Sequence, residues 1–174
     1  MTATKTAETT RTTATNRRTT NGVRVFQAPD TLVQNLQKVL VDLIELHLQG
    51  KQAHWNLVGT NFRDLHLQLD DIVDIARLAA DTIAERMRAL DAVPDGRTDT
   101  VAATTSVPAA PAGLVGSTDT VEIISDRIYA TVDTVRAIHD EVDAADPSTA
   151  DLLHSIIVDL EKQAWMLKSE NGKA

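Results

Sequence analysis

Two pairs of potential metal ligands lie within one predicted helix, and the residues of each pair are four positions apart. They are His66 with Asp70, and Asp81 with Glu85. Four residues are about one helical turn, so the two side chains of a pair share a face and could bind one metal ion. A third ligand, His54, precedes this helix. Imidazole and carboxylate groups together suit Fe²⁺, Mn²⁺ or Zn²⁺, and leave coordination positions open for water or an oxidant.

The separation of the two pairs excludes a single metal centre within one chain. At 1.5 Å rise per residue, Asp70 and Asp81 are about 16 Å apart along the axis, and His66 and Glu85 about 28 Å. All four positions nevertheless fall within an arc of roughly 100° on the helix surface. If two such helices pack antiparallel about a two-fold axis, the first pair of one chain meets the second pair of the other. The spacing therefore predicts two identical metal sites per dimer.

Salt bridges are the alternative explanation of this acidic stripe, because an isolated helical acid usually faces solvent. Arg77, Arg86 and Arg88 could neutralise the carboxylates without any metal. The presence of His54 favours the metal interpretation, since it completes a mixed nitrogen and oxygen ligand set. Trp55 is most simply a packing residue, but next to a ligand it could also donate an electron.

The remaining histidines are weaker candidates. His47 fits a core or interface position better than a ligand position. Asp151 and His154 are three residues apart, which is compatible with metal binding, but no third ligand lies nearby in the sequence. His139 is expected to face solvent. The Glu-x-x-His pair that marks a di-iron centre within a single helical bundle does not occur, so such a centre is not expected.

Four helices must position these residues, and the spacing of apolar side chains predicts them. The links between the first and second helices and between the third and fourth are short, which forces antiparallel pairs. The long middle connection holds three of the five prolines and can carry a short helix. It can also travel the length of the bundle, which leaves the second and third helices parallel in an all-α, ferritin-like four-helix bundle. The helices are predicted at about 31–57, 61–93, 117–145 and from 148 onward, with the connection at 91–118.

Composition limits the class of protein further. The 174 residues suit one domain, and the absence of cysteine excludes disulfides and thiolate metal sites. A net charge of −8 argues against a uniformly basic nucleic-acid binder. Residues 1–22 are rich in threonine and mildly basic, so we expect a disordered tail there and the bundle domain at 23–174. No apolar run suits a signal peptide or a membrane span, which favours a cytoplasmic location.

The segment around the predicted ligands resembles the signature of the Dps family, the DNA-binding proteins from starved cells, which belong to the ferritin-like superfamily. The similarity extends over roughly residues 25–170, and only the tail lies outside it. One departure is Leu90-Asp91-Ala92, where the family often has Leu-Gly-Gly. The matching positions, with the family's spacing, are His54-Trp55-Asn56, Gly59, Phe62, Leu65-His66, Asp70, Asp81 and Ala84-Glu85-Arg86.

This resemblance implies a hollow dodecamer that oxidises Fe²⁺, preferably with hydrogen peroxide, and stores ferric mineral, so protecting DNA from oxidative damage. His54, His66 and Asp70 of one subunit, with Asp81 and Glu85 of its two-fold mate, would be the ferroxidase ligands for iron, and Trp55 would quench stray radicals. Acids at three-fold pores guide iron inward in this family, which points to Asp146 and Asp151, although both could equally be helix-capping acids.

DNA binding is the alternative function that the resemblance raises. Members of this family often bind DNA through mobile basic tails, and residues 1–22 carry Lys5, Arg11, Arg17 and Arg18 against the single acid Glu8. Weak phosphate contacts repeated over many subunits would add up to useful avidity. On this alternative the chain is a nucleoid-binding structural protein, and iron oxidation is secondary.

Overall fold

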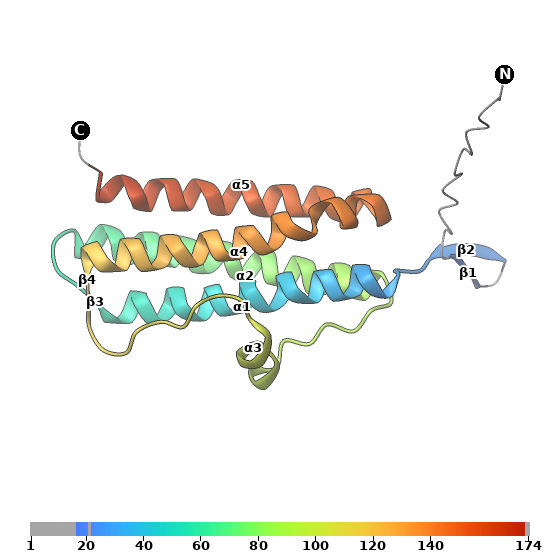
Figure 1. The fold of residues 1–174 in the computed structure, drawn as a ribbon, viewed down its shortest axis with the longest axis horizontal. Coiled ribbons are helices and arrows are strands. Elements are labelled where there is room, and N and C mark those ends of the chain that lie inside the picture. Colours follow the sequence, from blue (N-terminus) through green and yellow to red (C-terminus); the bar gives the residue numbers. More distant parts are fainter. Residues whose placement is uncertain (1–16, 21, 173–174) are drawn as a thin grey trace, which may run out of the picture.

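Four long helices form the bundle, and a short fifth helix lies in the crossover. The structure is a computed structural model that describes residues 17–20 and 22–172. It confirms the predicted all-α, ferritin-like arrangement, including the short helix in the middle connection (Figure 1). None of the described helices is long and apolar enough to cross a membrane. The helices are α1 (Asp30–Asn56), α2 (Phe62–Ala89), α3 (Thr98–Thr104), α4 (Ser117–Ala145) and α5 (Pro147–Glu170).

Two short strands fix the relative directions of the helices. Strand β3 (Leu57–Val58) precedes α2, and strand β4 (Val115–Gly116) leads directly into α4. The two strands pair in parallel, with Leu57 opposite Val115. Parallel strands run in the same direction, so α2 and α4 begin at the same end of the bundle (Figure 1). The predicted parallel arrangement of the second and third bundle helices is therefore confirmed, by a strand pair that the sequence did not suggest.

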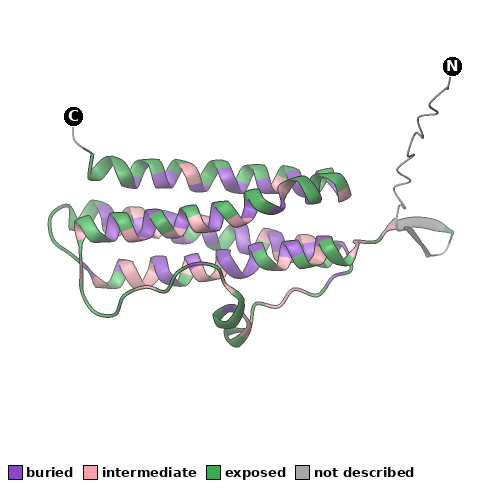
Figure 2. Ribbon diagram, in the orientation of Figure 1, coloured by how far each residue is buried: buried purple, intermediate pink, exposed green. Residues whose placement is uncertain are grey.

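The hydrophobic core is built from one apolar stripe on each long helix. Leu36, Leu69 and Leu153 are completely buried, as the helical spacing predicts. Figure 2 shows the buried residues on the sides of the helices that face one another. Leu48 and Phe62 also fit the spacing, but they are 47% and 44% exposed. A bundle helix buries only part of its circumference, and these two side chains lie at the edge of the buried stripe.

Asp42 fastens the crossover to the bundle. This residue of α1 is almost completely buried, and four hydrogen bonds end on its carboxylate. The hydroxyl groups of Thr105 and Thr134 donate at 2.8 Å and 2.7 Å. Ser106 donates both its backbone N–H, at 2.7 Å, and its hydroxyl, at 2.6 Å. A buried charge is tolerated when it is fully hydrogen-bonded, so this network holds the segment after α3 against α1 and α4.

Gly50 allows a close approach between α1 and α2. A Cβ atom at this position would lie only 2.9 Å from Cγ2 of Val73. Val73 is branched at Cβ and has little freedom to move away. Gly50 is one turn before His54 on α1, and Val73 is one turn after Asp70 on α2. The glycine therefore sets the distance between the two helices that carry the predicted ligands.

Both ends of α2 are made by residues in left-handed backbone conformations. Asn61 is the N-cap of α2, with φ of 57°, but its side chain accepts no hydrogen bond from the helix. Its amide N–H donates instead to Glu170, at 3.1 Å. Asp91 has φ of 60° just beyond the last turn. Glycine adopts this conformation without steric cost, and aspartate is one of the few other residues that tolerate it.

A β-hairpin precedes α1. Strand β1 (Arg17–Thr20) pairs antiparallel with strand β2 (Val23–Phe26), and Gly22 between them has φ of 81°. We expected residues 1–22 to form one disordered tail, and this is wrong for 17–20, which pair with the start of the predicted domain. Asn21-Gly22, followed by Val23, Val25 and Phe26, is the hairpin signal in this sequence. Residues 1–16 lie outside the described part of the chain.

Candidate metal centre

Three of the predicted ligands lie together at one end of the bundle. His54 comes from the last turn of α1, while His66 and Asp70 come from the first half of α2. The chain reverses between the two helices, so their ends are side by side. One potential ligand atom from each residue lies within 4.8 Å of the others. The structure thus assembles a half-site of two imidazoles and one carboxylate within a single chain.

The two imidazole rings hold each other in place through their backbones. Nδ1 of His54 lies 2.9 Å from the carbonyl oxygen of His66, and Nδ1 of His66 lies 3.1 Å from that of His54. A carbonyl only accepts hydrogen bonds, so Nδ1 carries the proton in each neutral ring and Nε2 keeps its lone pair. The rings also stack, with centroids 3.6 Å apart. In neutral rings this arrangement leaves Nε2 of each imidazole as the atom that a metal ion would bind.

The carboxylate of Asp70 already has a cationic partner, Lys51. The ammonium group of Lys51 donates a hydrogen bond to Oδ1 of Asp70, and Nδ1 of His54 lies 3.2 Å from the same oxygen. The bond from Lys51 is the main reason why the pKa of Asp70 is lowered from its ordinary value. Sequence reasoning did not single out Lys51. The available signal was its position three residues before His54, on the same face of α1.

Asp81 and Glu85 lie apart from this half-site. Both are exposed on α2, and Asp81 is eleven residues, or about 16 Å of helix, beyond Asp70. Neither residue forms an ion pair with any residue that the structure describes. The two predicted pairs are therefore not joined within one chain, as the spacing indicated.

The three arginines that could neutralise the stripe are engaged elsewhere in the described chain, so they do not pair with Asp81 or Glu85. Arg77 contacts Asp74 at 3.3 Å. Nη1 of Arg88 donates to a backbone carbonyl at 2.7 Å. Nη2 of Arg86 lies 2.5 Å from Oδ2 of Asp146, at the start of α5. Asp146 is thus buried and paired, unlike a free acid lining a pore, whereas Asp151 is exposed.

Two exposed aromatic residues are close to the ligands, Trp55 in the sequence and Phe62 in space. Trp55, next to His54, is 67% exposed, so the expectation that it packs is not met within a single chain. The ring of Phe62 lies 5.2 Å from the ring of His66. Large apolar groups are thus accessible around polar ligands on this part of the described surface. Such a combination is typical of a surface that another molecule covers.

One of the other histidines, His139, lies in surroundings that differ from the prediction. His139 was expected to face solvent, but its side chain is only 22% exposed and stacks on His154, with centroids 4.5 Å apart. The chain reverses at Asp146 between α4 and α5, so residues that are a similar number of positions before and after Asp146 lie side by side. Nδ1 of His154 is 4.0 Å from Asp151, and no third ligand converges there among the described residues.

His47 on α1 is half-buried. Its pKa is lowered, mainly because burial disfavours the charged imidazolium and secondly because the positive charge of Arg77 repels it.

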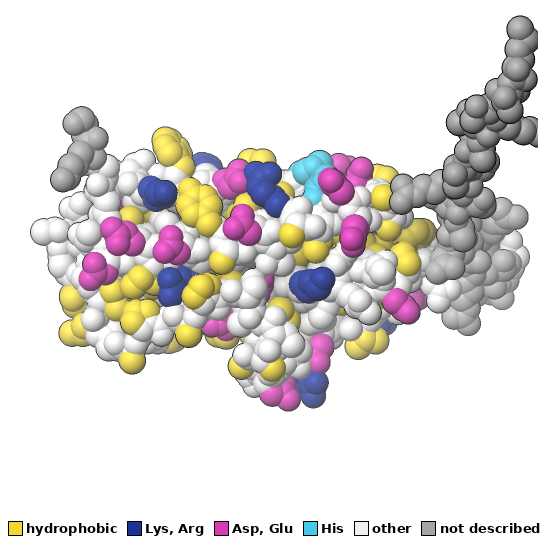
Figure 3. Space-filling model, in the orientation of Figure 1, with side chains coloured by type: hydrophobic (Ala, Val, Ile, Leu, Met, Phe, Trp, Pro, Cys, Tyr) yellow, Lys and Arg dark blue, Asp and Glu magenta, His cyan; other side chains and the backbone are white. Residues whose placement is uncertain are grey.

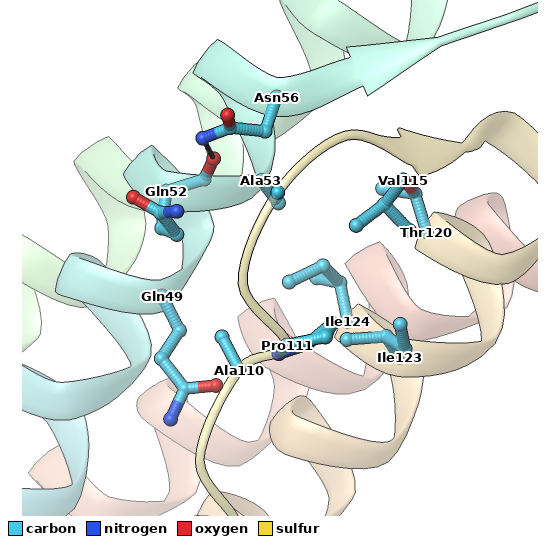
Figure 4. Close-up of a pocket in the computed structure, with 11 residues that line it drawn as sticks. Gln49, Gln52, Ala53, Asn56, Ala110, Pro111, Val115, Thr120, Ile123 and Ile124 are labelled. Carbon is cyan, nitrogen blue, oxygen red and sulfur yellow. Dashed lines mark hydrogen bonds between the residues drawn. The ribbon is translucent and has the colours of Figure 1, made fainter.

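A separate pocket lies between α1, the crossover and the start of α4 (Figure 4). Its walls are largely apolar and include Ala53, Pro111 and Ile124. The buried hydroxyl of Thr120 lines it without a hydrogen-bond partner. The lining contains neither a carboxylate nor an imidazole, so this pocket is not a second metal site.

The fold and the half-site together define the class of the protein. Residues 33–174 match the model of the ferritin-like domain family. The chain is therefore a ferritin-like four-helix protein, and the converging imidazole and carboxylate groups lie at its helix ends.

Comparison with individual proteins narrows this class to one family. A DNA protection during starvation protein from Agrobacterium fabrum is 34% identical over 143 residues, which are 82% of this chain and 88% of that protein. The structure of Dps from Microbacterium arborescens in the high iron form has a TM-score of 0.79 and 35% identity to this chain, and the match covers 83% of this chain and 94% of that one. The chain belongs to the Dps family of DNA protection during starvation proteins.

Relatives in this family differ in length. DNA protection during starvation protein 2 from Deinococcus radiodurans is 32% identical over 137 residues, and this match covers 79% of the chain. The same match spans only 57% of the Deinococcus protein. The chain thus spans a little over half the length of this relative.

Proposed function

We propose that this chain is an iron-storing ferroxidase that oxidises Fe²⁺ at sites shared between two subunits. The observation that carries the proposal is the division of the ligands. His54, His66 and Asp70 converge in one chain, whereas Asp81 and Glu85 remain exposed and without an ion pair in its described part. A two-fold mate that packs α2 antiparallel would supply the missing carboxylates to each half-site. The relative from Microbacterium arborescens, solved in a high iron form, supports iron as the metal.

The exposed aromatic edge supports the presence of that mate. Trp55 and Phe62 are costly to leave in water, and a second copy placed over the half-site would cover them together with the ligands. Further copies would close a hollow dodecamer, in which ferric mineral is held. Light scattering of the purified protein, with and without iron, tests this closed assembly directly.

The ligand set suits the chemistry of iron oxidation by hydrogen peroxide. Two Fe²⁺ ions each give one electron to a single peroxide, and with two protons this yields two Fe³⁺ ions and two water molecules. Because both electrons go to the same oxidant molecule, no hydroxyl radical is released. Carboxylates favour the harder Fe³⁺ product, while the small number of protein ligands leaves it able to move into the cavity.

A mixing experiment tests whether the sites are shared. We expect His66→Ala with Asp70→Ala, and Asp81→Ala with Glu85→Ala, each to abolish the ferric absorbance that follows addition of Fe²⁺ and peroxide. Random reassembly of the two variants makes half of all pairs mixed, and each mixed pair has one complete site of two. About a quarter of the wild-type activity should return. Recovery of no activity, with intact assembly, would contradict the shared site.

DNA binding through the N-terminal segment is the second candidate function, favoured by four basic residues against one acid in residues 1–22. The face in Figure 3 mixes acidic and basic side chains without one basic patch. Replacing Lys5, Arg11, Arg17 and Arg18 together by glutamine removes all four positive charges, and we expect this variant to lose a low-salt gel shift without a change in iron oxidation. The protein would act in the cytoplasm, at the nucleoid if the tail binds DNA.

A further inference from the structure

A second pair of stacked imidazoles, His139 on α4 and His154 on α5, lies near the opposite end of the bundle from the half-site. The ring centroids are 4.5 Å apart, and the ring planes differ by 28°. The two imidazoles of the half-site have a similar arrangement, with centroids 3.6 Å apart and an angle of 23°. The proposed function makes no use of this second pair.

Each imidazole of the second pair has a carboxylate beside its Nδ1 atom. Nδ1 of His139 lies 3.2 Å from Oδ1 of Asp140, and Nδ1 of His154 lies 4.0 Å from Oδ1 of Asp151. A carboxylate only accepts hydrogen bonds, so Nδ1 carries the proton in the neutral ring of His139 and Nε2 keeps its lone pair. Histidines that bind metal are commonly oriented in this way, by a carboxylate at the nitrogen that does not bind.

The Nε2 atom of His139 is buried, and it has no hydrogen-bond partner among the described residues. A buried polar atom without a partner costs free energy, so a group that binds this lone pair would stabilise the structure. The side chain of His154 is stacked against this ring and is 59% exposed. It can therefore turn aside and admit such a group from solvent.

The charges around the pair favour a cation as that group. Arg136, one turn before His139, is already paired with Glu161 of α5. In Figure 3, histidine lies beside acidic side chains over α5. Three exposed acids are close to the two histidines in the sequence, and they are Asp140, Asp143 and Asp151.

We propose that His139 and His154 bind Zn²⁺ through their Nε2 atoms, at a site separate from the iron half-site. Zn²⁺ binds imidazole nitrogen at about 2.0–2.1 Å, so two such nitrogens on one tetrahedral ion lie about 3.4 Å apart. The two rings, with centroids 4.5 Å apart, need to lean together by only about 1 Å. A third protein ligand does not converge there among the described residues, so water completes the coordination.

The ligand atoms of the two sites differ in kind. The half-site joins two imidazoles to the carboxylate of Asp70, whereas the second pair offers imidazole nitrogen alone and keeps its carboxylates at Nδ1. For a given set of ligands, divalent zinc binds more tightly than divalent iron. The second pair therefore takes Zn²⁺ in preference to Fe²⁺, and this inference goes beyond the proposed function.

Calorimetric titration with Zn²⁺ tests the proposal on the full-length protein that carries His66→Ala and Asp70→Ala, which removes the half-site. We expect a class of sites with about one Zn²⁺ per chain, from the single imidazole pair. Adding His154→Gln should remove this class, because His139 alone cannot hold the ion. His47→Gln, which removes an imidazole elsewhere on α1, is the matched control and should leave the isotherm unchanged.

A second pair of variants separates binding by the histidines from general attraction by the acids. Asp140→Asn weakens the group that orients His139, so it should lower the affinity for Zn²⁺ by about tenfold. Asp143→Asn removes the same charge from a nearby exposed position and should have little effect. Equal losses in the two variants would overturn the proposal.

Crystals soaked in Zn²⁺ give a direct measurement. An anomalous peak at the zinc edge should lie about 2.1 Å from Nε2 of both histidines. A peak at Asp151 alone, or an unchanged isotherm in the His154→Gln variant, would overturn the proposal and leave the proposed function intact. His154→Gln in the otherwise wild-type protein should oxidise Fe²⁺ at the normal rate. A fall in that rate would show that the pair serves the iron site and is not separate from it.

Discussion

Asp42 and Asp70 are carboxylates on adjacent helices with opposite surroundings. Asp42 is buried and receives four hydrogen bonds, all from donors in its own chain. Asp70 is half-exposed, and its one strong partner is the movable ammonium group of Lys51. Asp81 and Glu85 are more exposed still and have no ion pair in the described chain. The carboxylate that stabilises the fold has hydrogen bonds on both of its oxygens. The carboxylates proposed to bind metal have oxygens that remain free to bind a cation.

The comparison separates stability from function among residues of the same type. A saturated buried carboxylate cannot accept another ligand without losing a bond that the fold needs. An exposed carboxylate contributes little to folding, so its lone pairs remain available to a cation. Substitution of the buried carboxylate should therefore lower the free energy of unfolding, whereas substitution of the exposed carboxylates should lower metal binding and leave stability almost unchanged.

Removal of the Asp42 carboxylate should have the largest effect. Asp42→Ala removes all four hydrogen bonds that hold the crossover to α1 and α4, and we expect the free energy of unfolding to fall by about 3 kcal/mol or more. Urea denaturation measures this change. Asp71→Ala, at an exposed position of α2, is the control and should stay within about 0.5 kcal/mol of the wild type. Equal effects at the two positions would contradict the role given to Asp42.

Removal of one donor to Asp42 should have an intermediate effect. Thr134→Val keeps the shape of the side chain and deletes a hydrogen bond to a charged group, which is worth about 2 kcal/mol. The loss in urea denaturation should be smaller than that of Asp42→Ala. A stability equal to that of the wild type would show that the crossover is held by its other contacts.

The acids of the second half-site should show the reverse pattern. Asp81→Asn with Glu85→Gln should change the free energy of unfolding of the metal-free protein by no more than about 0.5 kcal/mol, because both residues are exposed. Saturating Co²⁺, at a hundred times its dissociation constant, should stabilise the wild type by about 2.7 kcal/mol and leave this variant unaffected. Stabilisation of both proteins to the same extent would place the metal elsewhere.

The smallest effect should be a change in the titration of Asp70. Since Lys51 lowers the pKa of Asp70, the contribution of this pair to stability is present above the ordinary pKa of an aspartate and is lost as pH falls through the lowered one. In Lys51→Met the pKa should rise toward its ordinary value, and this acid-dependent contribution should disappear. Carboxyl-carbon NMR follows the titration. An unshifted pKa would mean that other groups control Asp70.

Sequence reasoning succeeded where the pattern is local. The helical spacing of apolar residues predicted the four long helices, and the lengths of their links predicted which neighbours are antiparallel and which parallel. Residues four apart on a helix, such as His66 and Asp70, have a fixed relation that the sequence contains. The antiparallel return from α1 to α2 was enough to bring His54 beside them.

Sequence reasoning failed for contacts between residues that are far apart in the chain. The donors to Asp42 are 63, 64 and 92 residues away, and no period in the sequence connects them. The stacking of His139 on His154 depends on how tightly the chain turns at Asp146, which spacing alone does not give. The hairpin was missed for another reason, because the threonine-rich composition of its first strand was interpreted only as disorder.

Gly50 has a consequence for how such a site can change during evolution. Its missing side chain lets α1 and α2 approach to the distance that sets the spacing of His54 from His66 and Asp70. A larger residue there would widen this spacing while every ligand stayed the same. Preference among ions of different radius can therefore be altered by a substitution that never contacts the metal. A search for variants with new metal selectivity should begin at position 50 as well as at the ligands.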